Sequence, residues 1–451
     1  MKKIAIWGFG ITGQAASRYF VKSPKYLEYQ IDIYEAQPAN LFEGVISHNE
    51  RVNYYFGSAE ISDVSRYEIL LVSPSIPKEN PVLQKAYESG VKVCNDTMIF
   101  IEEFKGMGKI IGVTGSNGKS TVVSLIYESL KTLGKKAILV GNIGQSPLDY
   151  LIDYSKQELD GTIAVIELSS FQLEIFEDQH YVDIAIITNL SPNHLDRHHN
   201  SMQEYADVKM KIFNQAESQI ITVSDDQGVQ EYILPKIKSS SLHLISLDSA
   251  GSDELISFVL KNYGNPSKVK LPGKHNLYNI AVSNKVLEIL GIEINNQKLI
   301  SFIQDYKGLE HRIEFVRNLN GLSFYNDSKS TSPDATRVAI ESFDESQNII
   351  LIMGGKDKKV SFDQLGPLIK SKVDEIIILS HEIDQKIVEL AEKNSVPYRI
   401  AENLKQVIDI VITSKIKNGV VLFSPGSSSL GKFKNYEDRG KQFKDIVNSL
   451  N

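Results

Sequence analysis

Short apolar runs alternate with helical patterns along most of the chain. Residues 110–113 form one such run, apolar and β-branched, and they predict a buried strand. A glycine-containing turn follows it, and a helical pattern opens at Ser120. Similar runs predict further strands, at residues 3–7, 30–34, 70–72, 137–140, 162–168, 182–188, 322–325, 348–353, 375–379 and 420–423. Strands that alternate with helices in this way indicate parallel, doubly wound α/β sheets.

Polar turns follow many of these strands. The carboxyl ends of parallel strands meet at one edge of a sheet, and ligands bind there. In the middle of the chain, the segments after four strands carry the loop at 114–121, Asn142, Glu167 and His194. We therefore expect these segments to line one crevice. Glycine-rich and polar turns also follow the strands of the last third of the chain, which predicts a second ligand-binding edge.

The loop at 114–121 reads Thr-Gly-Ser-Asn-Gly-Lys-Ser-Thr. Its glycines let the backbone curl around a polyphosphate and present N–H groups, and the helix N-terminus adds partial positive charge. Lys119 supplies a mobile charge, and the hydroxyls of Ser120 and Thr121 can hold Mg2+. The common phosphate loop has its first glycine two residues before the position of Gly115. The sequence therefore predicts a variant nucleoside triphosphate site.

Oxygen ligands for a cation are expected beside this loop. Mg2+ takes oxygen ligands and sits between phosphate oxygens. Glu167 ends a strand near the loop, so we expect it to act together with Ser120 or Thr121. The alternative is a carboxylate that caps a neighbouring helix.

Three histidines occur within the segment 194–199 and could suggest a zinc cluster. Zinc sites usually need three or four ligands with supporting spacing, and no partner cysteine exists here. We place His194, the nearest to the strand end, in the site and expect His198 and His199 to be solvated. By composition Lys209 is a surface lysine, and only a carbamate on its amine would let it hold Mg2+.

The turn at residues 8–13 follows the first strand and reads Gly-Phe-Gly-Ile-Thr-Gly. Glu35 ends the second strand about 20 residues later, as in the dinucleotide fingerprint. One interpretation is an NAD-dependent oxidoreductase. The other is a Rossmann-like turn that holds a different diphosphate, or none, and the second nucleotide loop at 114–121 favours it.

Length and composition narrow the class of protein. The 451 residues suggest about three domains. With a net charge of −7 there is no global basic field to hold nucleic acid. No apolar stretch approaches the roughly 18 residues of a membrane span, and the first apolar run is too short for a signal peptide. The single cysteine, Cys94, excludes internal disulfides. We expect a cytoplasmic, monomeric protein that acts on small molecules.

Taken together, the motifs resemble those of the Mur ligase family, which includes the folylpolyglutamate synthases. They occur in the family's order and spacing over nearly the whole chain, at 114–121, 141–144, 167–172, 194–197, Lys209, 275–279, 311–312, 326–329, 354–355 and 433–436. The resemblance implies a Rossmann-like N-terminal domain (1–97), a central P-loop ATPase domain with a parallel sheet (98–309) and a Rossmann-like C-terminal domain (310–451). Among the branches, the chain is most similar to the one that adds D-glutamate to UDP-N-acetylmuramoyl-L-alanine in peptidoglycan precursor synthesis.

The resemblance also implies site residues. ATP would bind to Gly115, Asn117, Gly118, Lys119, Ser120, Thr121, Asn276, Asn279, Arg312 and Asp327. Two Mg2+ ions would be held by Ser120, Thr121, Glu167, His194 and Lys209, the last as a carbamate. The UDP substrate would contact Ile11, Thr12, Glu35, Asn142, Ser169, Gln172 and His194. The amino acid would lie among Lys329, Thr331, Lys358, Ser429, Leu430 and Tyr436. The implied catalytic residues are Lys119, Glu167, His194 and Lys209.

The departures from the family pattern concern mainly the amino-acid pocket. Tyr436 replaces a common Phe, residues 330–332 read Ser-Thr-Ser instead of Ala-Thr-Asn, and residues 427–429 read Ser-Ser-Ser. Lys356 and Lys358 are both candidates for the pocket lysine.

Two other interpretations of the sequence remain open. A folylpolyglutamate-type ligase would leave the turn at 8–13 unexplained. A regulatory module that only binds nucleotide would be expected to lose its metal ligands first, and these are intact.

Overall fold

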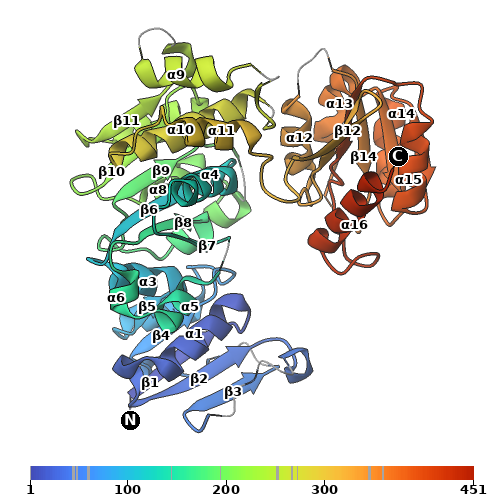
Figure 1. The fold of residues 1–451 in the computed structure, drawn as a ribbon. Helices are drawn as coiled ribbons and strands as arrows, with labels where there is room; N and C mark the ends of the chain where they lie inside the picture. Colours follow the sequence, from blue (N-terminus) through green and yellow to red (C-terminus); the bar gives the residue numbers. More distant parts are fainter. Residues whose placement is uncertain are drawn as a thin grey trace. The chain divides into compact units, whose positions relative to one another are not determined.

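The computed structural model describes residues 2–42, 46, 49–57, 61–143, 145–192, 195–249, 253–265, 268–271, 273–343, 347–357 and 360–450. The chain divides into two compact units, which are described separately. The first comprises residues 1–257 and 278–299, and the second comprises residues 258–277 and 300–451. The described strands form three sheets, two in the first unit and one in the second (Figure 1).

The first sheet is parallel, with five described strands in the order β3-β2-β1-β4-β5. Its strands are β1 (Lys2–Trp7), β2 (Tyr29–Glu35), β3 (Val52–Phe56), β4 (Ile69–Val72) and β5 (Lys92–Cys94). The helices along this part of the chain are α1 (Ile11–Lys22) and α2 (Pro81–Glu88). The turn predicted at residues 8–13 lies between β1 and α1, at the carboxyl end of the central strand.

The second sheet is also parallel, in the order β11-β10-β9-β6-β8-β7 among the described strands. Its strands are β6 (Lys109–Thr114), β7 (Ala137–Gly141), β8 (Ile163–Glu167), β9 (Ile184–Ile187), β10 (Gln219–Val223) and β11 (Leu242–Ile245). Its shorter helices are α5 (Pro147–Asp153), α6 (Lys156–Leu159) and α7 (Ser170–Leu173). The longer ones are α3 (Asp96–Phe104), α4 (Lys119–Thr132) and α8 (Met202–Met210). The strand β6 lies between β8 and β9, so the ends of these three strands are adjacent.

Three helices follow the second sheet along the chain. They are α9 (Glu254–Tyr263), α10 (Lys274–Ile289) and α11 (Gln297–Asp305). Among the described residues, no helix combines the length and apolar character needed to cross a membrane.

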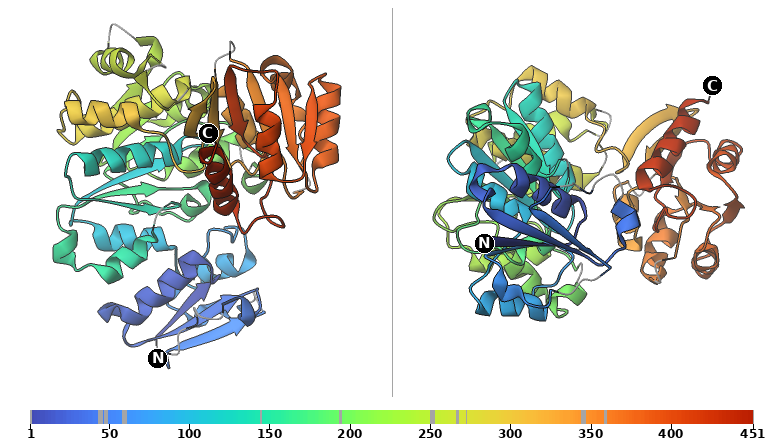
Figure 2. Two further views of the ribbon diagram at one scale, coloured as in Figure 1. Left: turned by 45° about the vertical axis from the view of Figure 1, so that its right-hand side comes forward. Right: turned by 90° about the horizontal axis from the view of Figure 1, so that it is seen from below.

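The third sheet has the order β12-β13-β17-β14-β15-β16 among the described strands. Its strands are β12 (Glu314–Leu319), β13 (Leu322–Asn326), β14 (Ile349–Met353), β15 (Glu375–Leu379), β16 (Tyr398–Ala401) and β17 (Gly419–Phe423). Its helices are α12 (Pro333–Glu341), α13 (Gly366–Lys372), α14 (Asp384–Lys393), α15 (Leu404–Ile412) and α16 (Tyr436–Asn448). Figure 2 shows helices on both sides of this sheet.

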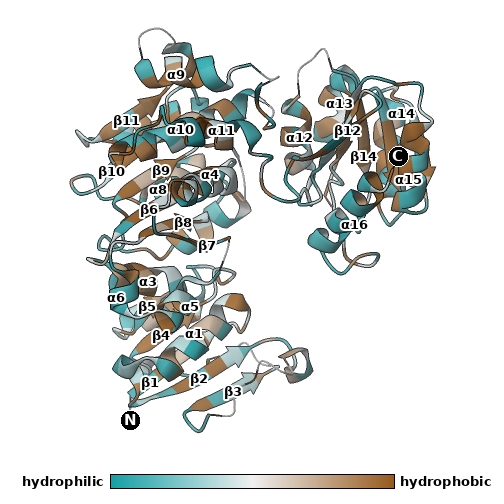
Figure 3. Ribbon diagram, in the orientation of Figure 1, coloured by the Kyte–Doolittle hydropathy of each residue, from teal (hydrophilic) through white to brown (hydrophobic). Residues whose placement is uncertain are grey.

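Alternating side chains of the strands build the core of the third sheet. In β14, Ile349, Leu351 and Met353 pack into one apolar cluster, while Ile350 and Ile352 pack into another. The first cluster includes residues of α12, α13 and α14, and the second includes residues of α15 and α16. Both faces of the sheet are therefore buried at β14, whose residues are all apolar, while the helices carry polar residues (Figure 3). The predicted doubly wound α/β architecture with three sheets is confirmed.

Six of the described strands were not predicted from the sequence, namely β3, β5, β10, β11, β12 and β16, and β12 also differs in direction. β12 runs antiparallel to β13 at the edge of the third sheet. Its sequence, Glu-Phe-Val-Arg-Asn-Leu, has no continuous apolar run, because an edge strand need not be buried on both faces. The domain boundaries expected near residues 97 and 309 are not tested by this division into units and remain a proposal.

Candidate active site

The phosphate loop joins β6 to α4, and the segment after β9 fixes its shape. Ser116 N–H donates to the carbonyl of Asn189 (3.0 Å), and the Thr188 hydroxyl donates to the carbonyl of Asn117 (2.6 Å). Gly115 has a φ of +140°, and a Cβ there would lie 2.0 Å from Thr188 Oγ1. Only glycine can hold this conformation so close to Thr188. The loop therefore presents backbone N–H groups at the start of the 14-residue helix α4, as an anion site requires.

Two lysines meet on one carbonyl of this loop. Lys119 Nζ donates to the carbonyls of Gly115 and Ser116, both at 3.0 Å. Lys209 Nζ, from α8, donates to the same carbonyl of Gly115 at 2.9 Å and lies 4.4 Å from the centre of the Tyr205 ring. Lys209 is only 1% exposed. Burial, together with the charge of Lys119, holds the pKa of Lys209 well below its usual value.

The burial of Lys209 corrects the expectation from composition, which was a surface lysine. His198 was expected to be solvated and is also buried, with its ring against Tyr205. Burial lowers the pKa of His198, so the ring is neutral at pH 7. His199 is exposed, as expected.

Glu167 ends β8 beside the loop. The register of β6 and β8 places it opposite Val113, two residues before Gly115. Its side chain is buried, and Asn142 Nδ2 donates to its Oε1 at 2.9 Å. The predicted convergence of Asn142, Glu167 and the loop is therefore confirmed. His194, expected in the same crevice, lies outside the described residues.

The side chains at the strand ends fit a magnesium ion better than a transition metal. Glu167, Ser120 and Thr121 offer oxygen atoms, which Mg2+ prefers. Within the described ranges, no group of three His, Cys, Asp or Glu residues could hold a metal. Thr114 Oγ1, directly before the loop, is buried without a hydrogen-bond partner in the described structure.

The turn at residues 8–13 is a second candidate ligand site in the same unit. Phe9 N–H donates to Glu35 Oε2 at 2.7 Å, which ties the end of β2 to the turn. A Cβ on Gly13 would lie 1.9 Å from the carbonyl oxygen of Gly8, so helix α1 can approach the turn only with glycine there. Ile11 is 81% exposed at the start of α1. This geometry suits a diphosphate ligand and does not by itself distinguish UDP from NAD.

A buried polar chain links this turn to the second sheet. Thr12 and Thr97 both hydrogen-bond to the carboxyl of Asp96. Thr97 Oγ1 accepts from Gln172 Nε2 (3.4 Å), and Gln172 Oε1 accepts from the amide and hydroxyl of Ser169 (3.0 and 2.9 Å). Thr12, Ser169 and Gln172, all predicted substrate residues, thus belong to one network. Asp96 and Thr97 were not singled out from the sequence.

The pH dependence of stability tests the buried carboxyl of Asp96. Burial raises its pKa to about 6, from 3.8. The folded state then binds more protons than the unfolded state between these values, so stability falls as pH rises from about 4 to 6. In urea unfolding, the free energy of unfolding of Asp96→Asn relative to that of the wild type should increase by about 2–3 kcal/mol from pH 4 to pH 7. A pH-independent difference between the two proteins would contradict this assignment.

In the second unit, the backbone around Arg312 is unusual. His311 and Ile313 have φ values of +65° and +45°, which is rare outside glycine and especially so for a β-branched residue. Glu314 Oε2 accepts from the amide of His311 (2.9 Å), and Asp327 Oδ1 accepts from the amide of Ile313 (3.2 Å). These carboxylates hold the two strained residues that flank Arg312.

Asp327 itself is deeply buried. Its Oδ2 accepts from the hydroxyls of Ser330 (2.5 Å) and Ser424 (2.7 Å), and burial raises its pKa to about 6. Both oxygens of the Asp327 carboxyl are therefore engaged within the unit, and the contact of Asp327 with ATP stays a prediction.

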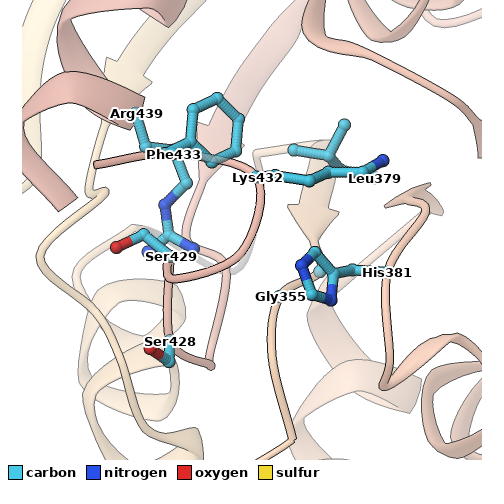
Figure 4. Close-up of a pocket in the computed structure, with 9 residues that line it drawn as sticks. Gly355, Leu379, His381, Ser428, Ser429, Lys432, Phe433 and Arg439 are labelled. Carbon is cyan, nitrogen blue, oxygen red and sulfur yellow. The ribbon is translucent and has the colours of Figure 1, made fainter. Parts of the chain in front are cut away.

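A small, partly open pocket lies at the carboxyl ends of β14, β15 and β17 (Figure 4). The lining comprises Gly354, Gly355, Leu379, His381, Ser428, Ser429, Lys432, Phe433 and Arg439. Arg439 is 1% exposed and donates to the carbonyls of Ser427 and Ser328 and to the Ser328 hydroxyl. Two cationic side chains and His381 give the pocket a basic character.

The predicted amino-acid residues are only partly gathered here. Ser429 lines the pocket, and Leu430 beside it is half exposed. Lys329 Nζ lies 5.8 Å from the centre of the Tyr436 ring, so these two predicted residues are brought together. Thr331 lies two residues after Lys329 along the chain, and Lys358 lies outside the described residues. Arg439, three residues after Tyr436, was not predicted as a site residue.

Asn276 and Asn279, both predicted ATP contacts, are buried on α10. Asn279 lies on the phosphate loop, because a Cβ on Gly118 would be 2.8 Å from its Oδ1. Asn276 belongs to the second unit, whereas the phosphate loop belongs to the first.

Three family models match the chain. They are the MurD-like N-terminal domain of Mur ligases over residues 2–95, the Mur ligase middle domain over 113–287, and the glutamate ligase domain of Mur ligases over 311–427. Structures with the same fold include the MurC ligase of Thermotoga maritima (TM-score 0.54, 16% identity, 100% of this chain and 99% of that one). The MurF ligase of the same organism, solved with ADP, has a TM-score of 0.56 at 15% identity, with 99% and 95% covered.

Sequence relatives extend over the whole chain. A UDP-N-acetylmuramoylalanine–D-glutamate ligase of Buchnera aphidicola is 32% identical over 100% of this chain and 98% of its own length. The ligase of the same name from Caldicellulosiruptor saccharolyticus is 31% identical, with 100% and 99% covered. With these identities over full length and family models on all three sheets, the chain belongs to the Mur ligase family.

Proposed function

We propose that the protein is an ATP-dependent ligase that joins D-glutamate to UDP-N-acetylmuramoyl-L-alanine in peptidoglycan precursor synthesis. The observation that carries this proposal is the phosphate loop with Lys119, Glu167 and Lys209 gathered around it. The full-length relatives that bear this activity in their names support the choice of substrates. We propose that it acts in the ATP-containing cytoplasm and as a monomer.

The phosphate loop and the buried groups beside it would hold ATP. Lys119 and the N–H groups at the start of α4 would face its phosphates, and Ser120, Thr121 and Glu167 would hold Mg2+, which neutralises charge on the transferred phosphoryl group. We propose that the remaining ATP contacts come from Gly115, Asn117, Gly118, Asn276, Asn279, Arg312 and Asp327.

Lys209 is chemically suited to become a carbamate. Its lowered pKa favours the neutral amine, and a neutral amine attacks CO2. A nitrogen–carbon bond forms, a proton leaves the nitrogen, and the product carries carboxylate-like oxygens. These oxygens, with His194, would hold a second Mg2+.

The first unit also offers a path for the UDP substrate. Its nucleotide would lie at the turn of residues 8–13, with Ile11, Thr12 and Glu35, and its muramoyl–alanine part near Asn142, Ser169, Gln172 and His194. The substrate carboxylate would attack the γ-phosphorus of ATP, giving an acyl phosphate and ADP. The amine of D-glutamate would then attack the acyl carbon, and phosphate would leave from the tetrahedral intermediate.

The amino acid is proposed to bind in the second unit. The basic pocket that contains Ser429 suits a dicarboxylate, because His381, Lys432 and Arg439 line it. The proposed contacts are Lys329, Thr331, Lys358, Ser429, Leu430 and Tyr436.

Phosphate release tests the whole proposal. We expect release with ATP, Mg2+ and UDP-N-acetylmuramoyl-L-alanine only when D-glutamate is added, and not with L-glutamate, L-lysine or meso-diaminopimelate. Release with another amino acid would keep the ligase reaction and contradict the pocket assignment. No release from folded protein that binds ATP would favour a folate-type ligase or a regulatory module. Binding of NADH would favour the oxidoreductase reading of the turn at 8–13.

A further inference from the structure

Arg197 has a set of contacts that the proposed reaction does not use. It lies in the short helix η4 (Leu195–His198), in the segment that follows β9, and its side chain is 13% exposed. Its Nη2 and Nε donate to Glu174 Oε2 at 2.8 and 3.3 Å, and its guanidinium carbon lies 4.6 Å from the centre of the Phe171 ring. Glu174 is also buried. Phe171 of α7 and Glu174 directly after it therefore fix the orientation of the guanidinium.

The same guanidinium reaches the first sheet. It donates to three successive backbone carbonyls in the turn after β4, those of Pro74 (3.1 Å), Ser75 (3.2 Å) and Ile76 (2.9 Å). A planar guanidinium has five N–H donors in a fixed fork, so one side chain can serve a carboxylate and several carbonyls at once. A single lysine ammonium cannot reproduce this geometry.

The turn after β4, which Arg197 contacts, packs against the glycine turn at residues 8–13. Ser73 N–H donates to the carbonyl of Trp7 at 2.9 Å. A Cβ on Gly8, which has a φ of +99°, would lie 2.8 Å from Ser73 Cβ. The two turns are therefore in contact, and a shift of one moves the other.

Arg197 consequently ties together three segments that carry candidate substrate residues. They are the paired turns of the first sheet, the α7 segment with Ser169 and Gln172, and the segment after β9. These segments are far apart in sequence, and no single element of secondary structure connects them.

We propose that Arg197 is a positioning residue that sets the spacing between the UDP end of the substrate, at the paired turns, and its reacting carboxylate, at the end of the second sheet. The inference rests on the proposed function, because only a long ligand that spans both sheets needs this spacing. Misplacement of one end by about 1 Å can cost roughly 100-fold in rate. In this unit ATP is proposed to bind at the phosphate loop and at Asn279, and the contacts of Arg197 described above involve neither, so ATP binding should not depend on Arg197.

The test compares kcat/KM and KM for the two substrates in Arg197→Met and Arg197→Lys. In Arg197→Met we expect kcat/KM for UDP-N-acetylmuramoyl-L-alanine to fall by roughly 100-fold, with a higher KM for this substrate and a KM for ATP within about twofold of the wild type. Arg197→Lys keeps a cation beside Glu174 and should therefore fold, but we expect an intermediate effect because it loses most of the carbonyl contacts. Calorimetric binding of the UDP substrate without ATP should weaken in the same order.

Arg18→Met is the matched control. Arg18 forms a bidentate ion pair with Asp149 that joins α1 to α5, also between the two sheets, but it is half exposed and touches neither turn. We expect its kinetic constants to equal those of the wild type. An equal effect in Arg18→Met would show that the loss of any bridge between the two sheets has the same consequence, and it would overturn the proposal.

A second readout separates this inference from the proposed function. The amide of Ile76 donates to the carbonyl of Ser73 within the held turn, so its hydrogen exchange should accelerate in Arg197→Lys. If the wild-type protein releases no phosphate, the proposed function fails, and exchange at this turn still decides whether Arg197 holds it. Unchanged exchange, or an unchanged KM for the UDP substrate in an active enzyme, would overturn the inference.

Discussion

Lys119→Met should lower kcat for phosphate release by about 1000-fold while the protein folds normally. The carbonyls of Gly115 and Ser116 hold the Lys119 ammonium at 3.0 Å each, over the loop where the phosphates are expected. Its charge is therefore in place before the substrate binds, and it costs no reorganisation during the reaction. Loss of a preorganised charge at a transferring phosphoryl group should appear chiefly in kcat.

The substitution Lys119→Met should change the free energy of unfolding only slightly, because its losses and gains offset one another. Two hydrogen bonds are lost, each worth about 1 kcal/mol net, but the repulsion of Lys119 on Lys209 disappears as well. Urea unfolding should therefore give a free energy within about 2 kcal/mol of the wild type. Lys131→Met, in the last turn of the same helix and exposed, is the control and should be fully active. Wild-type turnover in Lys119→Met would remove this residue from the proposed mechanism.

The architecture and the phosphate loop were predictable because both follow from local constraints. Apolar runs of strand length, separated by helical patterns, gave the parallel sheets, since a strand covered on both faces must be apolar throughout. The loop was predictable because a lysine and two hydroxyls after a glycine at this spacing serve few other purposes. Five of the six described strands that were not predicted, β3, β5, β11, β12 and β16, lie at sheet edges, where a strand need not be apolar throughout.

The environment of individual side chains was not predictable in the same way. Lys209 lies on a helix whose buried neighbours include Tyr205 and Val208, but its partner, the carbonyl of Gly115, is 94 residues away. Arg197 contacts carbonyls more than 120 residues earlier in the chain. A periodic pattern shows which positions face inward, whereas it does not show which distant backbone groups they meet there. The polar residues of the candidate site that were missed are of this kind.

Lys209→Met should abolish activity and yet leave the protein at least as stable as the wild type. The Lys209 side chain is 1% exposed, and burying its ammonium is costly, as its strongly lowered pKa shows. Methionine is unbranched, of similar length and uncharged, so it can fill the same space without that cost. The carbonyl of Gly115 would keep its bond from Lys119 Nζ, so no buried acceptor is left unpaired.

The activity should nevertheless fall by at least about 100-fold, because the carbamate would supply oxygen ligands that methionine lacks. Lys209→Arg should be as inactive, since a guanidinium stays protonated and cannot react with CO2. Urea unfolding and phosphate release measured on the same samples give both quantities. A carbon-13 signal from labelled bicarbonate should appear on the wild type and be absent from Lys209→Met.

These two measurements together distinguish a functional lysine from a structural one. A lysine kept for packing or for its hydrogen bond to the loop would lose stability on replacement and retain turnover in proportion to the folded fraction. A lysine kept for carbamate chemistry would lose turnover and gain stability, because its burial is a cost that only the reaction requires. Retained turnover in Lys209→Met would therefore contradict both the carbamate and the second Mg2+ that depends on it.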